Sequence, residues 1–388
     1  MKASSQKQLL HIVNWYPNQV NEKEGLWIRE HIKALEPFFH NRVAHIEVKP
    51  GKGFRRKRAL SDAVMSYSYE VPVRSWFLIE FLTTALLIFV LVFRCRLGRF
   101  SLINFHIAYP LCTYLHRIKR VIGLPCLITE HWSAYHFGFH TDKRSGIRRI
   151  GNIFRKNDVG VITVSEALKK DIEGFTGQSI RAYVLPNALP FRDLSPPKAS
   201  LEKAKGPSFF MLGQWKDPKR PLLALRAFLR FYSDDPSARL RIGGYGPQVE
   251  EIRNFIHENE REGNMAYMGE MEKEEILEAL HRADGFLHPS DYETFSVVCV
   301  EALSQGVPVI ASEKGGIPEY LDEENGILIP RNDVEHWVKG LEAFDQKRAN
   351  AFFDPPRIAN NARERFGRKR IGGRYQQLIE QEIVRFYR

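Results

Sequence analysis

Short apolar runs alternate with amphipathic stretches along most of this 388-residue chain. The runs are three to six residues long and rich in Val, Ile, Leu and Phe, which is typical of buried parallel strands. We predict strands at 9–13, 43–48, 102–105, 127–129, 159–164, 183–185, 209–212, 240–242, 266–268, 286–288 and 307–311. Strands that alternate with helices predict an α/β fold with doubly wound parallel sheets.

Helical spacing of apolar residues fills the stretches between these runs. We predict helices at 26–35, 76–93, 143–156, 166–175, 222–232, from 294 to about 305, and 368–387. The segment 51–58, GKGFRRKR, is predicted to be a flexible basic loop.

The most apolar stretch, 76–93, is interrupted by Glu80, Thr83 and Thr84. A membrane span needs about 20 apolar residues. We therefore expect a buried or half-buried helix. Because arginines flank its apolar surface, contact with a membrane face is the alternative.

The chain is long enough for two domains of ordinary size. Prolines at 190, 196, 197 and 207 stand among polar residues and predict a linker over 190–207. We accordingly place a first domain at 1–189 and a second at 208–367.

The net charge of +11 is unevenly distributed. Residues 1–200 hold 30 Lys and Arg against 15 Asp and Glu, whereas residues 201–388 hold 27 against 31. The first half is therefore expected to meet a membrane surface, an anionic glycolipid or a nucleic acid. The sequence shows no helix-turn-helix or aromatic-stacking module, so we do not expect a nucleic acid.

The four cysteines are scattered without a CxxC pair, which favours a reducing compartment and argues against a structural zinc. The apolar core of the N-terminal segment, Leu9 to Val13, is too short for a signal peptide. Both observations predict a cytoplasmic protein.

Two carboxylates, Glu293 and Glu301, frame the predicted helix that follows His288. Eight helical residues would place them ~12 Å apart along the axis and within ~80° of each other around it. An acid/base pair in a glycosidase needs roughly 5–9.5 Å. This pair is better placed to hold two ends of a long ligand. The alternative is that Glu293 caps a helix and Glu301 is merely solvated.

Backbone N–H groups near Thr294, Phe295 and Ser296, at the positive end of that helix, would suit a phosphate. Hydroxyl, phosphate and hydroxyl partners in this order match a sugar, a diphosphate and a ribose.

Residues 286–319 resemble the E-x7-E signature of retaining, nucleotide-sugar-dependent glycosyltransferases of the GT-B fold, family 4 type. The matching residues are His288-Pro289-Ser290, Glu293-Thr294-Phe295-Ser296, Glu301-Ala302, Gly306-Val307-Pro308-Val309, Gly315-Gly316 and Glu319. The resemblance implies two Rossmann-like domains facing across a cleft, with the acceptor on the first and the donor on the second. It also implies that the last helix, 368–388, crosses back to the first domain.

The resemblance implies a catalytic set of Glu293, His131 and Lys219, in which the lysine neutralises the diphosphate. Gln214 stands where the family has an arginine, so Lys216 or Arg220 would replace that cation. The predicted donor-binding residues are Gly25, Gln214, Lys216, Gly244, Gly246, Met268, Glu293, Thr294, Phe295, Ser296 and Glu301.

Both His106 and His131 follow predicted strands directly, where an open α/β sheet places its ligands. The resemblance puts His131, in the motif TEHWS, beside the transferred sugar. The predicted acceptor-side residues are His106, Trp132, Ser165 and Asn187.

The implied reaction moves a hexose from a nucleotide diphosphate sugar to an acceptor hydroxyl, with retention of the anomeric configuration. We expect no cofactor and no metal, a UDP-sugar rather than a GDP-sugar, and a glycan or lipid-linked acceptor in bacterial polysaccharide, lipopolysaccharide or glycolipid assembly. An anionic membrane surface is a further expected partner, which would make the enzyme peripheral at the inner membrane face. The alternatives are a nucleotide-sugar epimerase or hydrolase on the same fold, or a non-catalytic nucleotide-sugar binder, which Gln214 would favour.

Overall fold

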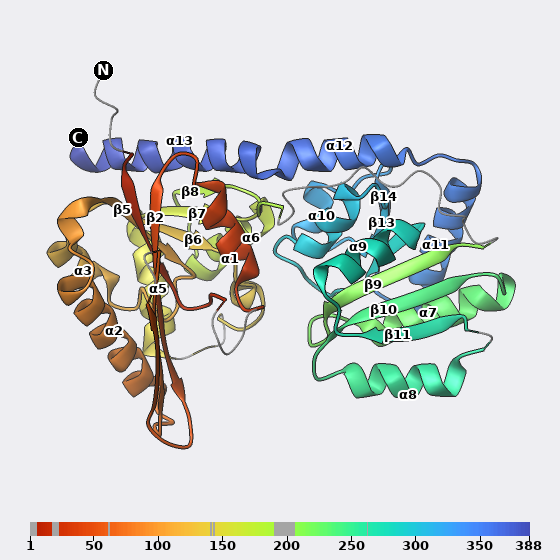
Figure 1. The fold of residues 1–388 in the computed structure, drawn as a ribbon, viewed down its shortest axis with the longest axis horizontal. Coiled ribbons are helices and arrows are strands. Elements are labelled where there is room, and N and C mark those ends of the chain that lie inside the picture. The colour runs from red at the N-terminus through yellow and green to blue at the C-terminus, as the bar shows by residue number, and fades with distance from the viewer. Residues whose placement is uncertain are drawn as a thin grey trace. The chain divides into compact units, whose positions relative to one another are not determined.

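A computed structural model describes residues 6–17, 23–60, 63–139, 142, 144–189, 206–261 and 263–388. The chain forms two compact units, here called unit 1 (Met1–Ala188 with Arg368–Arg388) and unit 2 (Leu189–Gly367). Each unit is a parallel sheet with helices packed around it (Figure 1). The predicted α/β class is therefore confirmed. Except for residues 206 and 207, the predicted linker lies outside the described residues.

Unit 1 contains a sheet of eight strands in the order β3-β4-β2-β1-β5-β6-β7-β8. Its strands are β1 (Gln8–Val13), β2 (His40–Pro50), β3 (Arg55–Leu60), β4 (Val64–Val71), β5 (Phe100–His106), β6 (Cys126–Glu130), β7 (Gly160–Thr163) and β8 (Ala182–Val184). All neighbours are parallel except β3 and β4. The central strands are buried on both faces, which explains why they read as continuous apolar runs.

The helices of unit 1 are α1 (Leu26–Ala34), α2 (Trp76–Phe93), α3 (Leu115–Ile122), α4 (Ala134–Phe137), α5 (Ser145–Lys156), α6 (Glu166–Thr176) and α13 (Arg368–Tyr387). A short 3-10 turn, Leu97–Arg99, precedes β5. On α13, Ile371, Tyr375 and Ile379 recur every fourth residue. All three are buried in the same core as Leu9 and Leu127, so the end of the chain completes the core of unit 1.

Unit 2 contains a six-stranded, wholly parallel sheet in the order β11-β10-β9-β12-β13-β14. Its strands are β9 (Ser208–Gln214), β10 (Arg239–Tyr245), β11 (Met265–Gly269), β12 (Gly285–His288), β13 (Val309–Ser312) and β14 (Gly326–Ile329). Its helices are α7 (Pro221–Asp234), α8 (Val249–Asn259), α9 (Lys273–Arg282), α10 (Val297–Ser304), α11 (Val334–Ala349) and α12 (Pro355–Phe366), with a 3-10 turn at Ile317–Glu319. Buried aromatic rings of β9, α7 and α11 pack together in its core.

The basic segment 51–58 is not the flexible loop that the sequence predicted. Gly51 to Phe54 form a turn, and β3 then pairs antiparallel with β4. Charged residues are unusual in strands, but β3 lies at the edge of the sheet, where Lys and Arg side chains reach water.

The helix predicted from Thr294 begins three residues later, at Val297. Ser296 has a φ of 65°, which lies in the left-handed region and cannot continue into a helix upstream. Glu293 therefore stands in the loop before α10, and the ~12 Å spacing calculated for a continuous helix does not apply.

Candidate functional site

Two loops at the carboxyl ends of β9 and β12 are bound to each other in unit 2. The backbone N–H of Asp291 donates to Pro218 O at 2.9 Å, and that of Arg220 donates to Pro289 O at 2.7 Å. An isolated bridge joins Lys219 to Ser290. In an open parallel sheet the carboxyl ends of the strands are where ligands bind, so this loop pair is the natural place for a site.

The loop pair brings Lys219 against Glu293. Lys219 Nζ lies 2.5 Å from Glu293 Oε1, and His288 Nε2 lies 3.0 Å from the same oxygen. Ser296 Oγ is 3.1 Å from His288 Nε2 and 3.2 Å from Cys299 Sγ. Sequence reasoning selected Lys219, Glu293 and Ser296 for the site but left out His288, although it quoted His288 in the motif.

The charges of this cluster are strongly coupled. Burial would raise the pKa of Glu293, but Lys219 and His288 hold it well below its usual range. Burial would lower the pKa of His288, but Cys299 and Glu293 outweigh it and raise that pKa to about 9. At neutral pH His288 is therefore protonated, and it contacts the Glu293 carboxylate together with the Lys219 ammonium group. Two N–H donors that meet at one oxygen can also serve an anionic ligand.

The backbone behind Glu293 is held by two consecutive glycines of the loop after β13. Gly315 has a φ of 61°, and a Cβ there would lie 2.0 Å from Glu293 O. The N–H of Gly316 donates to the same oxygen at 2.8 Å. Sequence reasoning quoted these glycines in the family motif but did not assign them to the site, and the glycine pair in the loop after a strand was the available signal.

The predicted phosphate cradle is only partly supported. Phe295 is buried against Tyr320 and Phe366, so its side chain belongs to the core. Thr294 and Ser296 lie before the helix rather than in its first turn, and the free N–H groups at the helix start belong to the residues from Val297 onward. Glu301 is half-buried on α10.

Three of the predicted donor-binding glycines have a packing role that needs no ligand. A Cβ at Gly244 would lie 2.0 Å from Gly213 O, and one at Gly246 would lie 2.5 Å from Trp215 O. A Cβ at Gly25 would lie 2.5 Å from Trp15 O. In all three, φ is positive, so the local backbone alone requires glycine.

The cations proposed to replace the family's arginine differ in their environments. Gln214 is exposed at the end of β9. Arg220 is bound to Asp291, with Nη1 2.9 Å from Oδ2. Lys216 is exposed and forms no ion pair with the residues that the structure describes. Met268, the predicted base-side residue, is half-exposed on β11.

In unit 1, the turn that carries His131 and Trp132 is organised by a buried carboxylate. Glu130 accepts hydrogen bonds from the N–H groups of His131 (2.9 Å) and Trp132 (3.1 Å), from Ala108 N–H (2.9 Å) and from the Tyr135 hydroxyl (2.8 Å). Burial raises the pKa of Glu130. Sequence reasoning quoted this residue in the TEHWS motif but gave it no role.

Four buried histidines gather in unit 1, one within β1, one at the end of β5, one directly after β6 and one on α1. His11 Nδ1 is 3.1 Å from His106 Nε2, and His31 Nε2 donates to Pro186 O at 3.0 Å. The His131 ring is stacked on His106 and tilted against His31, with centroids 6.0 and 5.3 Å apart. Burial lowers the pKa of all four, to about 4 for His11 and His31, so the cluster is neutral at pH 7. The structure thus brings His106 and His131 together, as predicted from their positions after strands.

The residue after His106, Ile107, has a φ of 65°. This conformation is costly for a β-branched side chain, and strain of this kind concentrates at functional sites. Of the other predicted acceptor-side residues, Asn187 lies beside His131. Trp132 packs edge-on against Trp15. Ser165 is buried and caps α6 by accepting from Leu168 N–H at 3.0 Å, which gives it a structural role.

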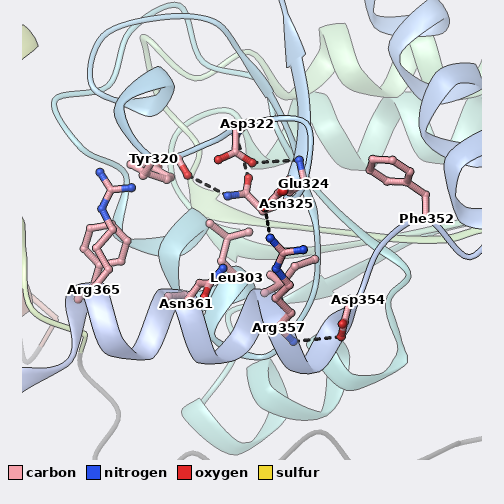
Figure 2. A pocket seen from close by; sticks show the side chains of 13 residues that line it. Leu303, Tyr320, Asp322, Glu324, Asn325, Phe352, Asp354, Arg357, Asn361 and Arg365 are labelled. Atoms are coloured by element: carbon pink, nitrogen blue, oxygen red, sulfur yellow. Dashed lines mark hydrogen bonds and ion pairs between the residues drawn. The ribbon is translucent and has the colours of Figure 1, made fainter.

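A separate cavity of about 260 Å³ lies between α12 and the loop 320–325 of unit 2 (Figure 2). Its charged side chains are held by bonds within unit 2. Arg357 is 2.8 Å from Glu324, Asp354 caps α12, and Asn325 bonds to Asp322 and Tyr320. None of the predicted site residues lines it.

Residues 196–365 match the family described as "Glycosyl transferases group 1". An exopolysaccharide phosphotransferase of Streptomyces coelicolor is 31% identical over 187 residues, which are 47% of this chain and 19% of that protein. A sulfoquinovosyl transferase of Arabidopsis thaliana is 34% identical over 111 residues, or 27% of this chain and 21% of that protein. The chain thus spans only about a fifth of the length of these relatives.

Solved structures cover the chain almost completely. HepE of Anabaena, in complex with UDP, has a TM-score of 0.71 at 15% identity and covers 97% of this chain and 100% of its own. The sucrose-phosphate synthase of Thermosynechococcus elongatus has a TM-score of 0.74 at 18% identity, with 98% and 100% covered. The lipopolysaccharide galactosyltransferase WaaB has a TM-score of 0.70 at 16% identity, with 97% and 99% covered. The chain has the GT-B fold, and together with the family match this supports a glycosyltransferase.

Proposed function

We propose that the protein is a retaining glycosyltransferase that moves a hexose from a nucleotide diphosphate sugar to an acceptor hydroxyl. The acceptor is a glycan or a lipid-linked sugar of bacterial polysaccharide, lipopolysaccharide or glycolipid assembly. The observation that carries the proposal is the contact of Lys219 and His288 with one oxygen of Glu293, inside the segment that matches the glycosyltransferase family.

Donor binding would exchange the partner of Lys219. Without a donor, Lys219 is paired with Glu293 at 2.5 Å. A diphosphate carries more negative charge than one carboxylate, so it competes for the ammonium group. Once released, Glu293 keeps His288 as its partner and turns its acceptor oxygens to the hydroxyls of the sugar.

Transfer breaks the bond between the sugar C1 and the diphosphate oxygen and forms a bond between C1 and the acceptor oxygen. Negative charge grows on the leaving diphosphate, which takes up the proton of the acceptor hydroxyl. Lys219 and the N–H groups at the start of α10 neutralise that charge in our proposal, without a metal. Glu301 holds the ribose, and Met268 lies at the edge that receives the base. UDP is favoured over GDP, and the UDP bound to HepE supports this choice.

The acceptor side of the proposal lies in unit 1. His131, with His106 and Asn187 around it, offers neutral polar groups that exchange hydrogen bonds with sugar hydroxyls. The exopolysaccharide and lipopolysaccharide enzymes among the similar proteins support an envelope glycan as acceptor. The excess of basic residues over 1–200 supports a peripheral position at an anionic membrane on the cytoplasmic side.

A donor screen tests the proposal. The melting temperature of the full chain is first measured with UDP-, GDP- and ADP-sugars. Transfer is then assayed with the donor that stabilises the protein and with acceptors from a lipid extract. We expect UDP-sugars to stabilise the protein and released UDP to increase when acceptor is added. Release of free sugar at the same rate with and without acceptor would identify a hydrolase instead. Stabilisation without any turnover would favour the non-catalytic binder suggested by Gln214.

A further inference from the structure

Helix α2 presents a continuous apolar surface to solvent. Of the sixteen large hydrophobic side chains that are exposed in the described parts of the chain, eight lie on this one helix, with 43–71% of their area accessible. They are Trp76, Phe77, Leu78, Phe81, Ile88, Phe89, Val92 and Phe93. At about 100° per residue, all of them except Trp76 in the first turn lie within about 160° around the axis, on the side opposite the buried residues of α2.

The polar residues of α2 point the other way, into the unit. Glu80 and Thr83 are each 1% exposed and Thr84 is 7% exposed. The two threonine hydroxyls donate to the carbonyls four residues earlier, and the Tyr109 hydroxyl donates to Glu80 at 3.0 Å. A helix on the surface of a globular protein normally turns its polar side to water. In α2 the outward side is apolar instead, and the inward side combines these polar residues with the buried Ile79, Leu87, Val90 and Leu91.

The rotation of α2 about its axis is fixed by Glu80. Its carboxylate occupies the space above Gly146 of α5, where a Cβ would lie 2.2 Å from Glu80 Oε1. Arg149 of α5 lies 3.9 Å from the other carboxylate oxygen. Turning the apolar side inward would move Glu80 out of this pocket and away from Tyr109. The outward apolar surface is therefore built into the packing of α2 on α5 and β2.

The charges around this surface favour an anionic lipid bilayer as its partner. Arg74 precedes α2, and Arg94, Arg96 and Arg99 follow it, all exposed. Within residues 72–99 the one acidic residue is the buried Glu80. The guanidinium of Arg94 lies over the ring of Phe89, and that of Arg144 lies over Trp76. Apolar and aromatic side chains flanked by arginines are the composition of a helix that lies in the membrane interface.

A second exposed basic segment, around the turn between β2 and β3, lies near the beginning of α2. The Gly51 N–H donates to Val71 O, so the turn before β3 is adjacent to the end of β4, only a few residues before Trp76. Phe54 in this turn is 83% exposed, and Arg55, Arg56 and Lys57 behind it are exposed as well. Figure 1 shows the connection between β2 and β3 extending beyond the rest of unit 1.

By length and composition, α2 is the one described helix that could cross a bilayer. Its packing argues for a position in the membrane plane instead. Its 18 residues extend ~27 Å, short of a ~30 Å hydrocarbon core. Its polar side is also bonded to α5 and to Tyr109, and a spanning helix would have to leave these partners.

We propose that α2 inserts its apolar side in the plane of an anionic membrane, with the turn between β2 and β3 and the first residues of β3 as an electrostatic second contact. This inference rests on the membrane partner of the proposed function and deepens it by naming the surface. It places the histidine-lined site of unit 1 on a membrane-bound unit, where a lipid-linked acceptor is delivered by diffusion within the bilayer.

Flotation of the full chain with vesicles tests this inference. Wild-type protein is expected to float with vesicles rich in phosphatidylglycerol. Part of the binding should survive a change from about 0.1 M to about 1 M NaCl, where the Debye length falls from about 10 to about 3 Å. A triple variant, F77S, F81S and F89S, should lose binding about tenfold or more and lose its salt-resistant fraction.

Two comparison variants separate the contributions. The matched control F352S, V384S and F386S removes three side chains of similar exposure elsewhere and should float like the wild type. The variant R55S, R56S and K57S should bind vesicles more weakly than the wild type at low salt. At high salt the two should bind equally, because salt screens the electrostatic contribution that these residues make. Near-UV circular dichroism and the melting temperature show whether each variant is folded. All substituted positions are exposed, so we expect native values.

Two results would overturn the inference. One is flotation of the α2 triple variant to the same extent as the wild type. The other is a wild-type dimer in solution that the α2 triple variant converts to monomers, with no flotation of either, because a second copy would then cover the helix. If flotation depends on α2 but the protein has no transferase activity, the proposed function is refuted, whereas the inference that α2 binds the membrane stands.

Discussion

Lys219 and Glu293 stand 74 positions apart in the sequence, yet the ammonium nitrogen of one lies 2.5 Å from a carboxylate oxygen of the other. His288 contacts the same oxygen, so one carboxylate is shared by two cations. Without a donor, the ammonium group of Lys219 is neutralised by Glu293. A diphosphate would compete with the Glu293 carboxylate for this ammonium group.

Replacing Lys219 by Ala should lower kcat by about 10²–10³. Removing one charge-assisted contact to the leaving group costs roughly 2.7–4 kcal/mol of transition-state stabilisation in a water-excluded site. Steady-state kinetics with the stabilising nucleotide sugar measure the effect. Lys216→Ala is the control, since this side chain lies exposed in the same loop after β9. An active Lys219→Ala enzyme with an inactive Lys216→Ala enzyme would reverse the assignment.

Glu293 and Glu301 should differ in what their loss affects. Glu301→Ala should weaken binding of bare UDP, because its proposed partner is the ribose. Glu293→Ala should mainly lower turnover, because its proposed partner is the sugar, which bare UDP lacks. Isothermal titration with UDP, set beside kcat for both variants, separates the roles. An equal loss of UDP affinity in the two variants would refute the division.

UDP affinity should fall as the pH rises through about 9. The pKa of His288 is raised to about 9 by Cys299 and Glu293 against the effect of burial, so its positive charge is present at neutral pH and lost above that value. The same ionisation stabilises the fold fully below about pH 6.5 and ceases to do so as the pH rises through about 9. Titrations at pH 7.5 and about 10 test this. His288→Gln should reduce the difference between the two pH values, and an unchanged difference would assign the effect to another group.

Acid should destabilise unit 1 through its histidine cluster. Burial lowers the pKa of His11 and His31 to about 4, below the unfolded value of about 6.5, so the unfolded chain binds more protons. Stability is therefore fully present above about pH 6.5 and is lost as the pH falls. At about pH 5 the loss is about 2 kcal/mol for each group. Denaturant unfolding, followed by fluorescence at about pH 5 and above about pH 6.5, measures this loss of stability.

The double variant His11→Asn/His31→Gln should show a smaller pH dependence than the wild type. His40→Gln, at an exposed histidine of the same unit, should keep the wild-type dependence. Equal pH dependence in all three proteins would show that the buried histidines do not control acid stability.

Gly315→Ala should reduce both stability and turnover. The left-handed backbone alone costs roughly 1–2 kcal/mol for a residue with a side chain. In addition, the new methyl group would lie 2.0 Å from Glu293 O and force the Glu293 backbone to move. Gly263→Ala is the matched control, because its φ of 72° carries the same strain but nothing lies within 4 Å of its Cβ. Thermal melts and kcat are compared, and equal turnover in the two variants would contradict a positioning role for Gly315.

Sequence alone predicted eleven of the fourteen described strands, about half of the described helices and the fold class, but not β3, β4 and β14. Buried parallel strands read as apolar runs, and helices repeat apolar residues every three to four positions, so both are local patterns. The motif around Glu293 was visible in the sequence, and its resemblance to a known family placed Lys219 in the site. The range of α13, Arg368–Tyr387, was also correct, because its buried side recurs every fourth residue.

Only the tertiary structure decided which groups meet. The contact of Lys219 with Glu293, and the burial that raises one pKa and lowers others, depend on residues that are distant in the sequence. The pattern missed that β3 pairs with β4, because an edge strand of charged residues has no apolar run. The late start of α10 depends on the left-handed Ser296, which helical spacing does not reveal. On α2, composition fixed the helix, but the packing of Glu80 above Gly146 decided that its apolar side faces outward.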